Sequence, residues 1–315
     1  MREDELESWF DFVGLVFSKA QNRSYFVRHW QADPHRNING IFVCTRNSEI
    51  VGTLRVFHRE VYIAGKNRKM GGLGEVSTHK EFRRRGIASK LLKMALCYME
   101  ENGMEISMLS GDQSIYTGVG YKKIECAFLR TVVSIDKPSP QGPYNITKTK
   151  FTDLSAIQKE QIQSIYNANL KYGGLVRTPE YWESWVAAEL ALCEHTYLIE
   201  HSGKVLAFLH FTLENPRTLS IKEFDILPEI FEDTTERKNF LVDSLSQVLA
   251  GLQGDCAGEY TLVAPAVLGP FGKVQEDFKY EGMQILFLKG CSEAEEAAMS
   301  KFLKESWNGS AIDSF

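Results

Sequence analysis

The chain has 315 residues, of which 43% are hydrophobic and 24% are charged, and its net charge is −5. This composition is ordinary for a globular protein, and the length favours two domains. The acidic balance argues against a nucleic-acid partner, no apolar run approaches the roughly 18 residues of a membrane helix, and the acidic N-terminus is no signal peptide. Six scattered cysteines without a C-x-x-C pair indicate free thiols and no metal site. We therefore expect a cytoplasmic protein that binds neither membrane nor metal.

The first elements in chain order are a helix and a hairpin. The helix is predicted from apolar residues that recur at helical spacing, namely Leu6, Trp9, Phe10, Val13 and Phe17. A β-hairpin is predicted over residues 41–57, with its turn at Asn47–Ser48. The next β-prone run ends at Thr78, and a short charged turn follows it. No strand is expected before the first helix.

The turn after Thr78 carries the pattern Arg83-x-x-Gly86-x-Ala88 and leads into a helix over residues 87–102. Unpaired N–H groups and the helix dipole make such a helix start an anion site. Gly86 and Ala88 leave room for a diphosphate to approach the main chain, and the arginines add positive charge. The alternative is a basic helix start with a tight turn and no ligand.

A short strand is expected over residues 104–109, followed by the segment Ile115-Tyr116-x-x-Val119-Gly120-Tyr121. A phenol of pKa about 10 can donate a proton without being ionised at neutral pH, so a tyrosine in this segment is a candidate general acid. The alternative for either tyrosine is an ordinary half-buried aromatic residue, and this alternative is favoured for Tyr121.

The second half of the chain repeats the order of the first. Three of the nine prolines lie within residues 138–143, which is a linker composition. After it, a hairpin over residues 196–211 turns at Ser202–Gly203, a strand covers residues 218–226, and a helix covers residues 235–252. The helix start lacks the Arg-x-x-Gly-x-Ala pattern and carries Glu229, Glu232, Asp233 and Glu236. We expect this half to bind no coenzyme.

The loop pattern resembles the acetyl-CoA pyrophosphate loop of the GNAT acetyltransferase superfamily. The segment after it is similar to the Ile-Tyr-x-x-Phe-Gly-Tyr element of the enhanced intracellular survival (Eis) acetyltransferases, although Val119 replaces the Phe. The segment from Gly174 to Trp182 resembles an element of their second domain. The resemblance implies an α/β fold with mixed α+β sheets, two GNAT domains in tandem. Tyr181, Trp182 and Trp185 are expected in the core.

The predicted divisions are an N-terminal catalytic domain at 1–136, a linker at 137–150, a degenerate second domain at 151–290, and a tail at 291–315 with a helix over residues 292–307. Eis proteins continue with a sterol-carrier-like domain, and none is expected here. In that family the terminal carboxylate reaches the active site as a base. We expect the carboxylate of Phe315 not to reach Tyr116.

The resemblance implies acetyl-CoA as co-substrate and Tyr116 as the general acid that protonates the coenzyme A thiolate. Glu75 is the candidate general base, flanked by Asp112 and His79, but each of the three also fits a cap, turn or surface residue. Water could instead accept the amine proton. The residues expected to bind acetyl-CoA are Val76, Ser77, Thr78, Arg83, Arg84, Arg85, Gly86, Ile87, Ala88, Ser89, Gly111 and Asp112.

Two functions fit this sequence. The first is an acetyl-CoA-dependent N-acetyltransferase that acts on a primary amine, either a small or aminoglycoside-like molecule or a lysine side chain. The second is a non-catalytic acyl-CoA-binding or interaction module. The expected partner is an amine-bearing small molecule or peptide, and a homo-oligomer is compatible with the sequence. Release of thiol from acetyl-CoA in the presence of amines distinguishes the two functions.

Overall fold

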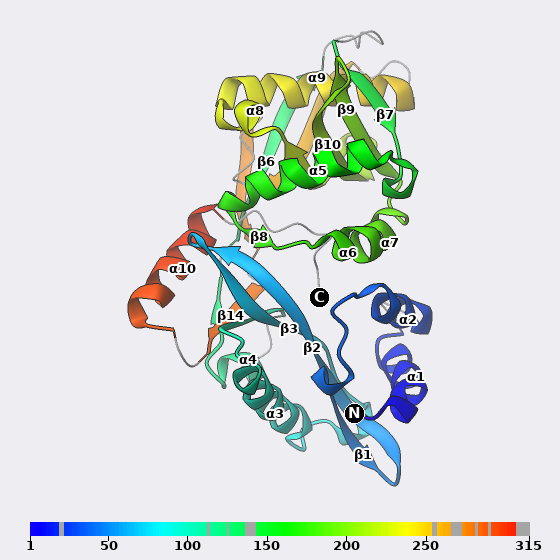
Figure 1. The fold of residues 1–315 in the computed structure, drawn as a ribbon, viewed down its shortest axis with the longest axis vertical. Coiled ribbons are helices and arrows are strands. Elements are labelled where there is room, and N and C mark those ends of the chain that lie inside the picture. Colours follow the sequence, from blue (N-terminus) through cyan, green and yellow to red (C-terminus); the bar gives the residue numbers. More distant parts are fainter. Residues whose placement is uncertain are drawn as a thin grey trace.

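Two mixed β-sheets organise the chain in the computed structural model (Figure 1). The structure describes residues 1–18, 22–111, 114–124, 126–135, 143–253, 257–265, 273–280, 283–288 and 291–306. Within these ranges each sheet has seven strands, and helices pack on its faces. The α/β (α+β) fold class and the mixed sheets predicted from the sequence are confirmed, because both sheets contain parallel and antiparallel strand pairs.

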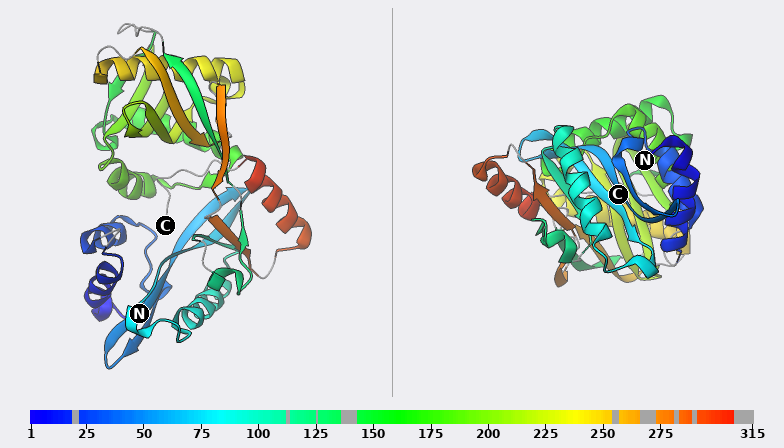
Figure 2. Two further views of the ribbon diagram at one scale, coloured as in Figure 1. Left: turned by 180° about the vertical axis from the view of Figure 1, so that it is seen from behind. Right: turned by 90° about the horizontal axis from the view of Figure 1, so that it is seen from below.

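The first sheet contains the predicted N-terminal hairpin. Its strand order is β1 (Ile41–Arg46), β2 (Glu49–Ile63), β3 (Lys66–Thr78), β4 (Ile106–Ser110), β14 (Met283–Phe287) and β5 (Lys122–Lys123), while β8 (Gly174–Leu175) pairs with β2. Helix α3 (Ile87–Glu101) covers one face of this sheet, and α1 (Leu6–Val16) and α2 (Arg23–Ala32) cover the other (Figure 2). The short α4 (Ser114–Thr117) follows β4, and α10 (Glu293–Ser306) packs beside the sheet.

Successive residues of β2 point to opposite faces of the first sheet, and each face has its own core. Leu54 and Val56 pack in one cluster with Leu91 and Leu92 of α3. On the opposite face, the indole N–H of Trp9 donates to the Thr53 hydroxyl at 2.9 Å. Both faces of β2 are therefore covered, which explains why this long strand is buried along most of its length.

The second sheet has the strand order β13 (Lys273–Tyr280), β6 (Cys126–Ile135), β12 (Gly258–Pro265), β11 (Thr218–Ile226), β10 (Lys204–Asn215), β9 (His195–His201) and β7 (Asn145–Lys148). The helices around it are α5 (Ala156–Asn169), α6 (Pro179–Tyr181), a π-helical turn (Trp182–Val186), α7 (Ala187–Leu190), α8 (Pro228–Glu232) and α9 (Thr234–Gln253). The predicted hairpin turn, the strand over 218–226 and the helix over 235–252 are all confirmed. Tyr181, Trp182 and Trp185 are core residues, as expected.

The two halves exchange strands, so the sheets do not follow the predicted division into residues 1–136 and 151–290. Strand β6 leaves the first half and pairs with β12 and β13 of the second sheet. Strand β14 returns from the second half and pairs antiparallel with both β4 and β5. Composition marks a proline-rich segment but does not show which sheet a flanking strand joins.

The predicted linker at 137–150 is partly a strand. Residues 145–148 form β7, which pairs with β9, whereas residues 136–142 lie outside the described part of the chain. The predicted helix at 292–307 is confirmed as α10, but Phe315 lies outside the described residues. That the carboxylate of Phe315 does not reach Tyr116 therefore stays a prediction.

Candidate active site

Strands β3 and β4 separate at the edge of the sheet where the predicted loop begins. Their parallel pairing joins residues 70–73 of β3 to residues 106–109 of β4. Strand β3 continues to Thr78, and no pairing of this last part with β4 occurs among the described residues. The unpaired edge leaves main-chain N–H and C=O groups that a ligand in the gap can use.

A bulge on β3 lies at the start of this unpaired edge. Thr53 of β2 pairs with Ser77 and Arg55 pairs with Gly74, so Leu54 opposes both Glu75 and Val76. Glu75 has a left-handed φ of 56°, which a residue with a side chain rarely adopts. Such bulges bend a strand and redirect a side chain. Here the bulge directs Glu75 towards Arg55 of β2.

The loop after β3 turns sharply and leaves the start of α3 uncapped. Arg84 and Gly86 have φ values of 62° and 77°, and Gly86 is the N-cap of α3 without a side-chain cap. The Nε of Arg83 donates to the Thr78 carbonyl at 3.2 Å, which fixes the loop to the strand end. The Arg85 guanidinium lies over the Phe82 ring, 5.3 Å from its centroid. Residues 87–89 thus present their N–H groups outward, as at known anion sites.

A cavity of about 490 Å³ lies in front of this helix start. It is formed by the end of α1, the end of β3, the loop, the start of α3 and α4. Its lining includes nine of the twelve residues predicted to bind acetyl-CoA: Val76, Ser77, Thr78, Arg83, Arg84, Gly86, Ile87, Ala88 and Ser89. The remaining lining residues are Val16, Phe17, Phe82 and Ile115. Arg85 and Gly111 are not part of this lining, and Asp112 lies outside the described residues.

Tyr116 and Tyr121 are both buried but differ in what their hydroxyl groups do. The Tyr121 hydroxyl lies 2.6 Å from Ser107 Oγ, and Ser107 Oγ donates to the Gly71 carbonyl at 2.7 Å. Tyr121 must therefore be the donor to Ser107. No hydrogen bond of the Tyr116 hydroxyl occurs among the described residues, and burial raises the pKa of this phenol. Tyr116 is thus protonated at neutral pH and free to donate.

The exchanged strand β14 supports the end of β4. The Gln284 side chain donates from Nε2 to the carbonyl of Gly111, across 173 residues of sequence. Gln284 is fully buried, and Gly111 packs closely against the Tyr116 ring, where an added Cβ would lie 3.4 Å from it. A residue of the second half therefore holds the backbone that supports the candidate acid.

Glu75 lies within a group of buried charges. Its Oε1 is 3.6 Å from Nη1 of Arg55, and its Oε2 has no hydrogen-bond partner among the described residues. Arg55 Nη2 donates to Asp33 Oδ2 at 2.7 Å, and Arg59 also pairs with Asp33. Burial raises the pKa of Glu75 to about 7, and the positive charge of Arg55 partly opposes this rise. A carboxyl group of this kind is well suited to accept a proton near neutral pH.

His79, which also flanks the site in the sequence, follows the end of β3. Its ring lies 5.9 Å from that of Phe82, and its Nδ1 is buried without a partner in the described part of the chain. No contact links it to Tyr116 or Glu75 among the contacts of the described residues. His79 is also not among the residues that line the cavity.

Sequence reasoning missed Asp33, Arg55, Arg59 and Gln284. For the arginines a signal was present, because they are four residues apart in a largely apolar strand and must share a face. Charged residues on a buried face need partners. No comparable signal marked Gln284, whose role depends on the strand exchange.

The second half also has a strand that separates from its parallel partner, because β11 pairs with β12 only over residues 218–220 and continues to Ile226, but the start of α9, the long helix that follows, is capped. The Asp233 carboxylate accepts from the backbone N–H of Glu236 at 2.8 Å, so it caps the start of α9. Glu223 lies five residues beyond Thr218, the first residue of the parallel β11–β12 pairing, as Glu75 lies five beyond Met70. Arg177 binds both Glu223 oxygens, at 2.7 and 2.9 Å. The corresponding carboxylate is therefore fully held by a cation.

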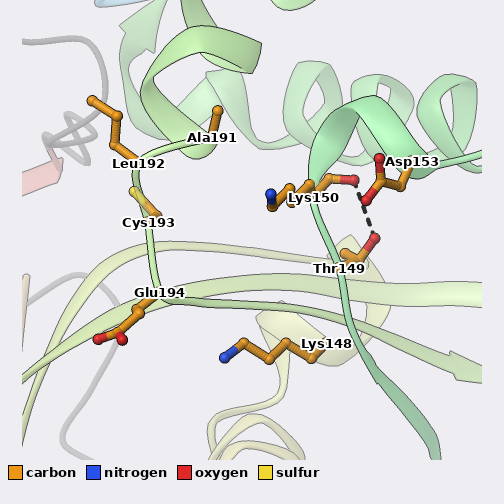
Figure 3. A pocket seen from close by; sticks show the side chains of 8 residues that line it. All are labelled: Lys148, Thr149, Lys150, Asp153, Ala191, Leu192, Cys193 and Glu194. Carbon is orange, nitrogen blue, oxygen red and sulfur yellow. Dashed lines mark hydrogen bonds between the residues drawn. The ribbon is translucent and has the colours of Figure 1, made fainter.

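A further cavity of about 440 Å³ lies in the second half, between the end of β7 and the start of β9 (Figure 3). Lys148 and Lys150 line one side, and Cys193 and Glu194 line the other. Burial raises the pKa of the Cys193 thiol to about 11, so this cysteine is a poor nucleophile at neutral pH. The mixed charges and the inert thiol give this cavity no chemistry related to the candidate site.

Residues 1–124 match the family model described as the acetyltransferase (GNAT) domain. This match identifies residues 1–124 as a GNAT acetyltransferase domain, the domain of an acyltransferase enzyme, and the predicted resemblance to this superfamily is confirmed for this part of the chain. No curated protein sequence is significantly similar to the chain. In the described residues no helix is long and apolar enough to cross a membrane, and no cluster of three or more His, Cys, Asp or Glu residues is arranged to hold a metal ion.

Solved structures share the fold across most of the chain. A probable N-acyltransferase from Enterococcus faecalis has a TM-score of 0.66 at 16% identity, over 92% of this chain and 72% of that one. Eis1 from Mycobacterium abscessus has a TM-score of 0.53 at 13% identity, over 84% and 71%. Saccharomyces cerevisiae N-myristoyltransferase with bound myristoyl-CoA has a TM-score of 0.54 at 11% identity, over 90% and 80%. At these identities the likeness concerns the fold.

Proposed function

We propose that the chain is an acetyl-CoA-dependent N-acetyltransferase that transfers the acetyl group to a primary amine by direct attack on the thioester. The observation that carries this proposal is the uncapped start of α3, which faces a cavity where β3 and β4 separate. A helix start without a capping side chain leaves several N–H groups unsatisfied. The diphosphate of a coenzyme supplies the missing acceptors.

The coenzyme would bind along this edge in two parts. Its diphosphate lies at the N–H groups of residues 87–89, where the helix dipole and the exposed Arg83 and Arg84 favour negative charge. Its pantetheine arm follows the unpaired edge of β3 over residues 74–78 and hydrogen bonds to the main chain. This path brings the thioester towards the bulge at Glu75 and Val76.

In the reaction, the amine nitrogen attacks the thioester carbonyl carbon, and the carbonyl oxygen takes on negative charge. The C–S bond then breaks as Tyr116 donates its proton to the sulfur of coenzyme A. Glu75 accepts a proton from the amine, directly or through water. The products are the N-acetylated amine and free coenzyme A, and proton exchange with solvent restores Tyr116 and Glu75.

Two features of the site support these roles. The Tyr116 hydroxyl is protonated and makes no hydrogen bond to any described residue, so none of these residues competes for its proton. With a pKa of about 7, Glu75 is a stronger base than an ordinary carboxylate and is still partly ionised at neutral pH. The corresponding Glu223 of the second half, bound by Arg177, has no such freedom.

The acceptor we propose is a primary amine of a small molecule or of a lysine side chain in a peptide. The donor is acetyl-CoA, while a longer acyl-CoA is the alternative, because one structure of the same fold holds myristoyl-CoA. The cytoplasm, where acetyl-CoA is available, is the proposed location.

The experiment measures thiol release from acetyl-CoA, butyryl-CoA and myristoyl-CoA with a panel of polyamines, aminoglycosides and lysine peptides. Mass spectrometry of the amine identifies the product. We expect amine-dependent thiol release from acetyl-CoA and an increase of 42 Da in the amine, the mass added when one hydrogen is replaced by an acetyl group. Tight acetyl-CoA binding without turnover for every amine would contradict catalysis and support a binding module.

A further inference from the structure

Three charged side chains are buried together on the face of β2 that α1 and α2 cover. Asp33, Arg55 and Arg59 are 0%, 1% and 7% exposed. Asp33 is the C-cap residue of α2, and both arginines belong to β2. Burying charged groups without partners costs several kcal/mol each, so each of these three charges needs an opposite charge nearby.

Asp33 is placed to hold both arginines. Its Oδ2 accepts from Arg55 at 2.7 Å and from Arg59 at 3.2 Å, and its Oδ1 accepts from Arg59 at 3.0 Å. The Arg55 guanidinium also lies over the rings of Phe57 and Trp30, 4.0 and 4.9 Å from their centroids. With one edge bonded and two rings against its plane, Arg55 has little freedom to turn.

The remaining edge of Arg55 faces Glu75. Arg55 Nη1 is buried, has no hydrogen-bond partner within the described residues, and lies 3.6 Å from Glu75 Oε1. This separation is an ion-pair contact and is too long for a hydrogen bond. Arg55 therefore orients Glu75 by its charge, without a hydrogen bond. Arg177, in contrast, donates hydrogen bonds to both carboxylate oxygens of Glu223.

We propose that Arg55 is a positioning residue for Glu75 and that Asp33 holds Arg55 in this place. The proposal deepens the proposed function, because it rests on Glu75 as the base of that reaction. The two-carboxylate arrangement divides the Arg55 charge between Asp33 and Glu75, which leaves Oε2 of Glu75 available for a proton.

The charged groups near Glu75 act in opposite directions. Arg55 of β2 favours the ionised carboxylate, and Asp33 at the end of α2 disfavours it. Arg59 acts through Asp33, which it partly neutralises. Helix α1 presents the neutral Trp9 to this face, through its hydrogen bond to Thr53. Removal of the cation and removal of the second carboxylate must therefore move the titration of Glu75 in opposite directions.

The experiment follows the Glu75 carboxyl carbon by ¹³C NMR during a pH titration of the full chain, with Glu75→Gln to assign the signal. We expect Arg55→Met to raise the midpoint by about one pH unit or more and Asp33→Asn to lower it. Arg68→Met is the matched control, because Arg68 is a buried arginine of the same sheet that pairs with Glu105 and Glu295. Its midpoint should equal that of the wild type.

Kinetics then connect the titration to catalysis. In Arg55→Met, kcat should fall while KM for acetyl-CoA stays within about twofold, and the acid limb of kcat/KM should move with the NMR midpoint. If Arg55→Met does not fold, Arg55→Lys is the second variant. It keeps the buried charge but lacks the planar guanidinium that contacts Asp33 and Glu75 at once. An upward shift of the Glu75 midpoint in this variant supports the proposal. An unchanged midpoint in a folded Arg55 variant overturns it.

The NMR titration needs no turnover, so it separates the two proposals. Opposite shifts without transfer to any amine would leave the Arg55–Glu75 arrangement intact and contradict the proposed function. Transfer with a wild-type pH profile in Arg55→Met would support the function and contradict the positioning role.

Discussion

The Glu75 carboxyl combines a strained backbone, a buried side chain and a single ion-pair contact. Its folded-state pKa of about 7 lies above the usual value of 4.5. A carboxyl group whose pKa is raised by folding keeps its proton in the native state while the unfolded chain has lost it. Folding stability therefore decreases as the pH rises from about 4.5 to about 7.

Glu75→Gln should remove this pH dependence. Between pH 5 and pH 8, the free energy of unfolding of Glu75→Gln should rise relative to that of the wild type by about 2 to 3 kcal/mol, because most of the titration between the pKa values of 4.5 and about 7 lies in this window. Urea denaturation at the two pH values measures this change. An equal difference between the two proteins at both pH values would mean that Glu75 is not perturbed by folding.

Tyr116→Phe should separate the phenol's chemistry from its packing. The ring remains, so stability and acetyl-CoA affinity should change little, while kcat should fall by roughly 10²- to 10³-fold, as expected for loss of a general acid. The loss should be smaller for acyl donors with more acidic thiols. Steady-state kinetics with the best amine measures both effects.

Tyr121→Phe is the matched control for this change. It removes a hydroxyl that donates to Ser107, so it should cost stability, about 1 kcal/mol, and little activity. Near-normal kcat in Tyr116→Phe would assign the acid to another residue.

At the residue scale, a short motif places residues together without knowledge of the fold. Arg83, Gly86 and Ala88 line one cavity because strand, turn and helix start are consecutive in the chain, while their role in binding stays a prediction. Arg55 was missed, since its partners Asp33 and Glu75 lie 22 and 20 residues away, on other elements. Spacing along a chain does not show which buried charges meet.

At the scale of elements, α3 and α9 begin in opposite ways. Gly86 gives α3 no capping side chain, whereas Asp233 caps α9. The cap supplies an acceptor and negative charge at the place where a diphosphate would bind. The prediction that the second half binds no coenzyme follows from the same contrast. If it is right, each chain binds one equivalent of acetyl-CoA.

Gly86→Asp should weaken acetyl-CoA binding at least tenfold, or about 1.4 kcal/mol. The added carboxylate repels the diphosphate, and the added Cβ meets no protein atom within 4 Å, so the protein itself leaves room for the new side chain. Gly203→Asp is the matched control, because Gly203 has the same φ of 77° and an equally open surrounding. Both variants should lose about 1 kcal/mol of stability. Calorimetry showing equal affinities in the two variants would exclude this loop as the coenzyme site.

Acetyl-CoA should saturate the chain at one equivalent, and changes at residues 85–88 should abolish this binding. Isothermal titration calorimetry measures the stoichiometry directly. Two equivalents would show that the capped start of α9 still accepts a coenzyme. Asp233→Ala should cost about 1 kcal/mol of stability and create no second site.

The sequence predicted the helices and hairpins well because each depends on local periodicity and turn residues. Asn47–Ser48 and Ser202–Gly203 occupy the predicted turns with positive φ. The sequence did not predict the neighbours of β6 and β14. Strand β6 has ten residues and β14 has five, and the local pattern of neither strand identifies its neighbours, because pairing is decided by which sheet edge remains open after the rest has folded.

At the scale of the whole molecule, the strand exchange makes the halves dependent on each other. Without β14, the first sheet loses the strand between β4 and β5, and Gly111 loses its contact with Gln284. Without β6, the second sheet loses the strand between β12 and β13. Each half alone would expose unpaired strand edges, which favour aggregation.

We expect residues 1–136 expressed alone to show no cooperative thermal transition and no acetyl-CoA binding. Co-expressed fragments 1–142 and 143–315 should associate and recover the binding, because β6 and β14 can then pair across the cut. Circular dichroism and calorimetry measure these outcomes. A folded, binding-competent fragment 1–136 would contradict the importance of the exchange.

The return of β14 also affects the order of events during synthesis. Translation delivers β4 and the loop before α3 long before β14, since Gln284 follows Gly111 by 173 residues. In the nascent first sheet, the edges of β4 and β5 that pair with β14 therefore stay unpaired while most of the second half is made. Chaperones that shield exposed strands would act on this chain during that interval, and the coenzyme could first bind a completed site only after β14 has left the ribosome.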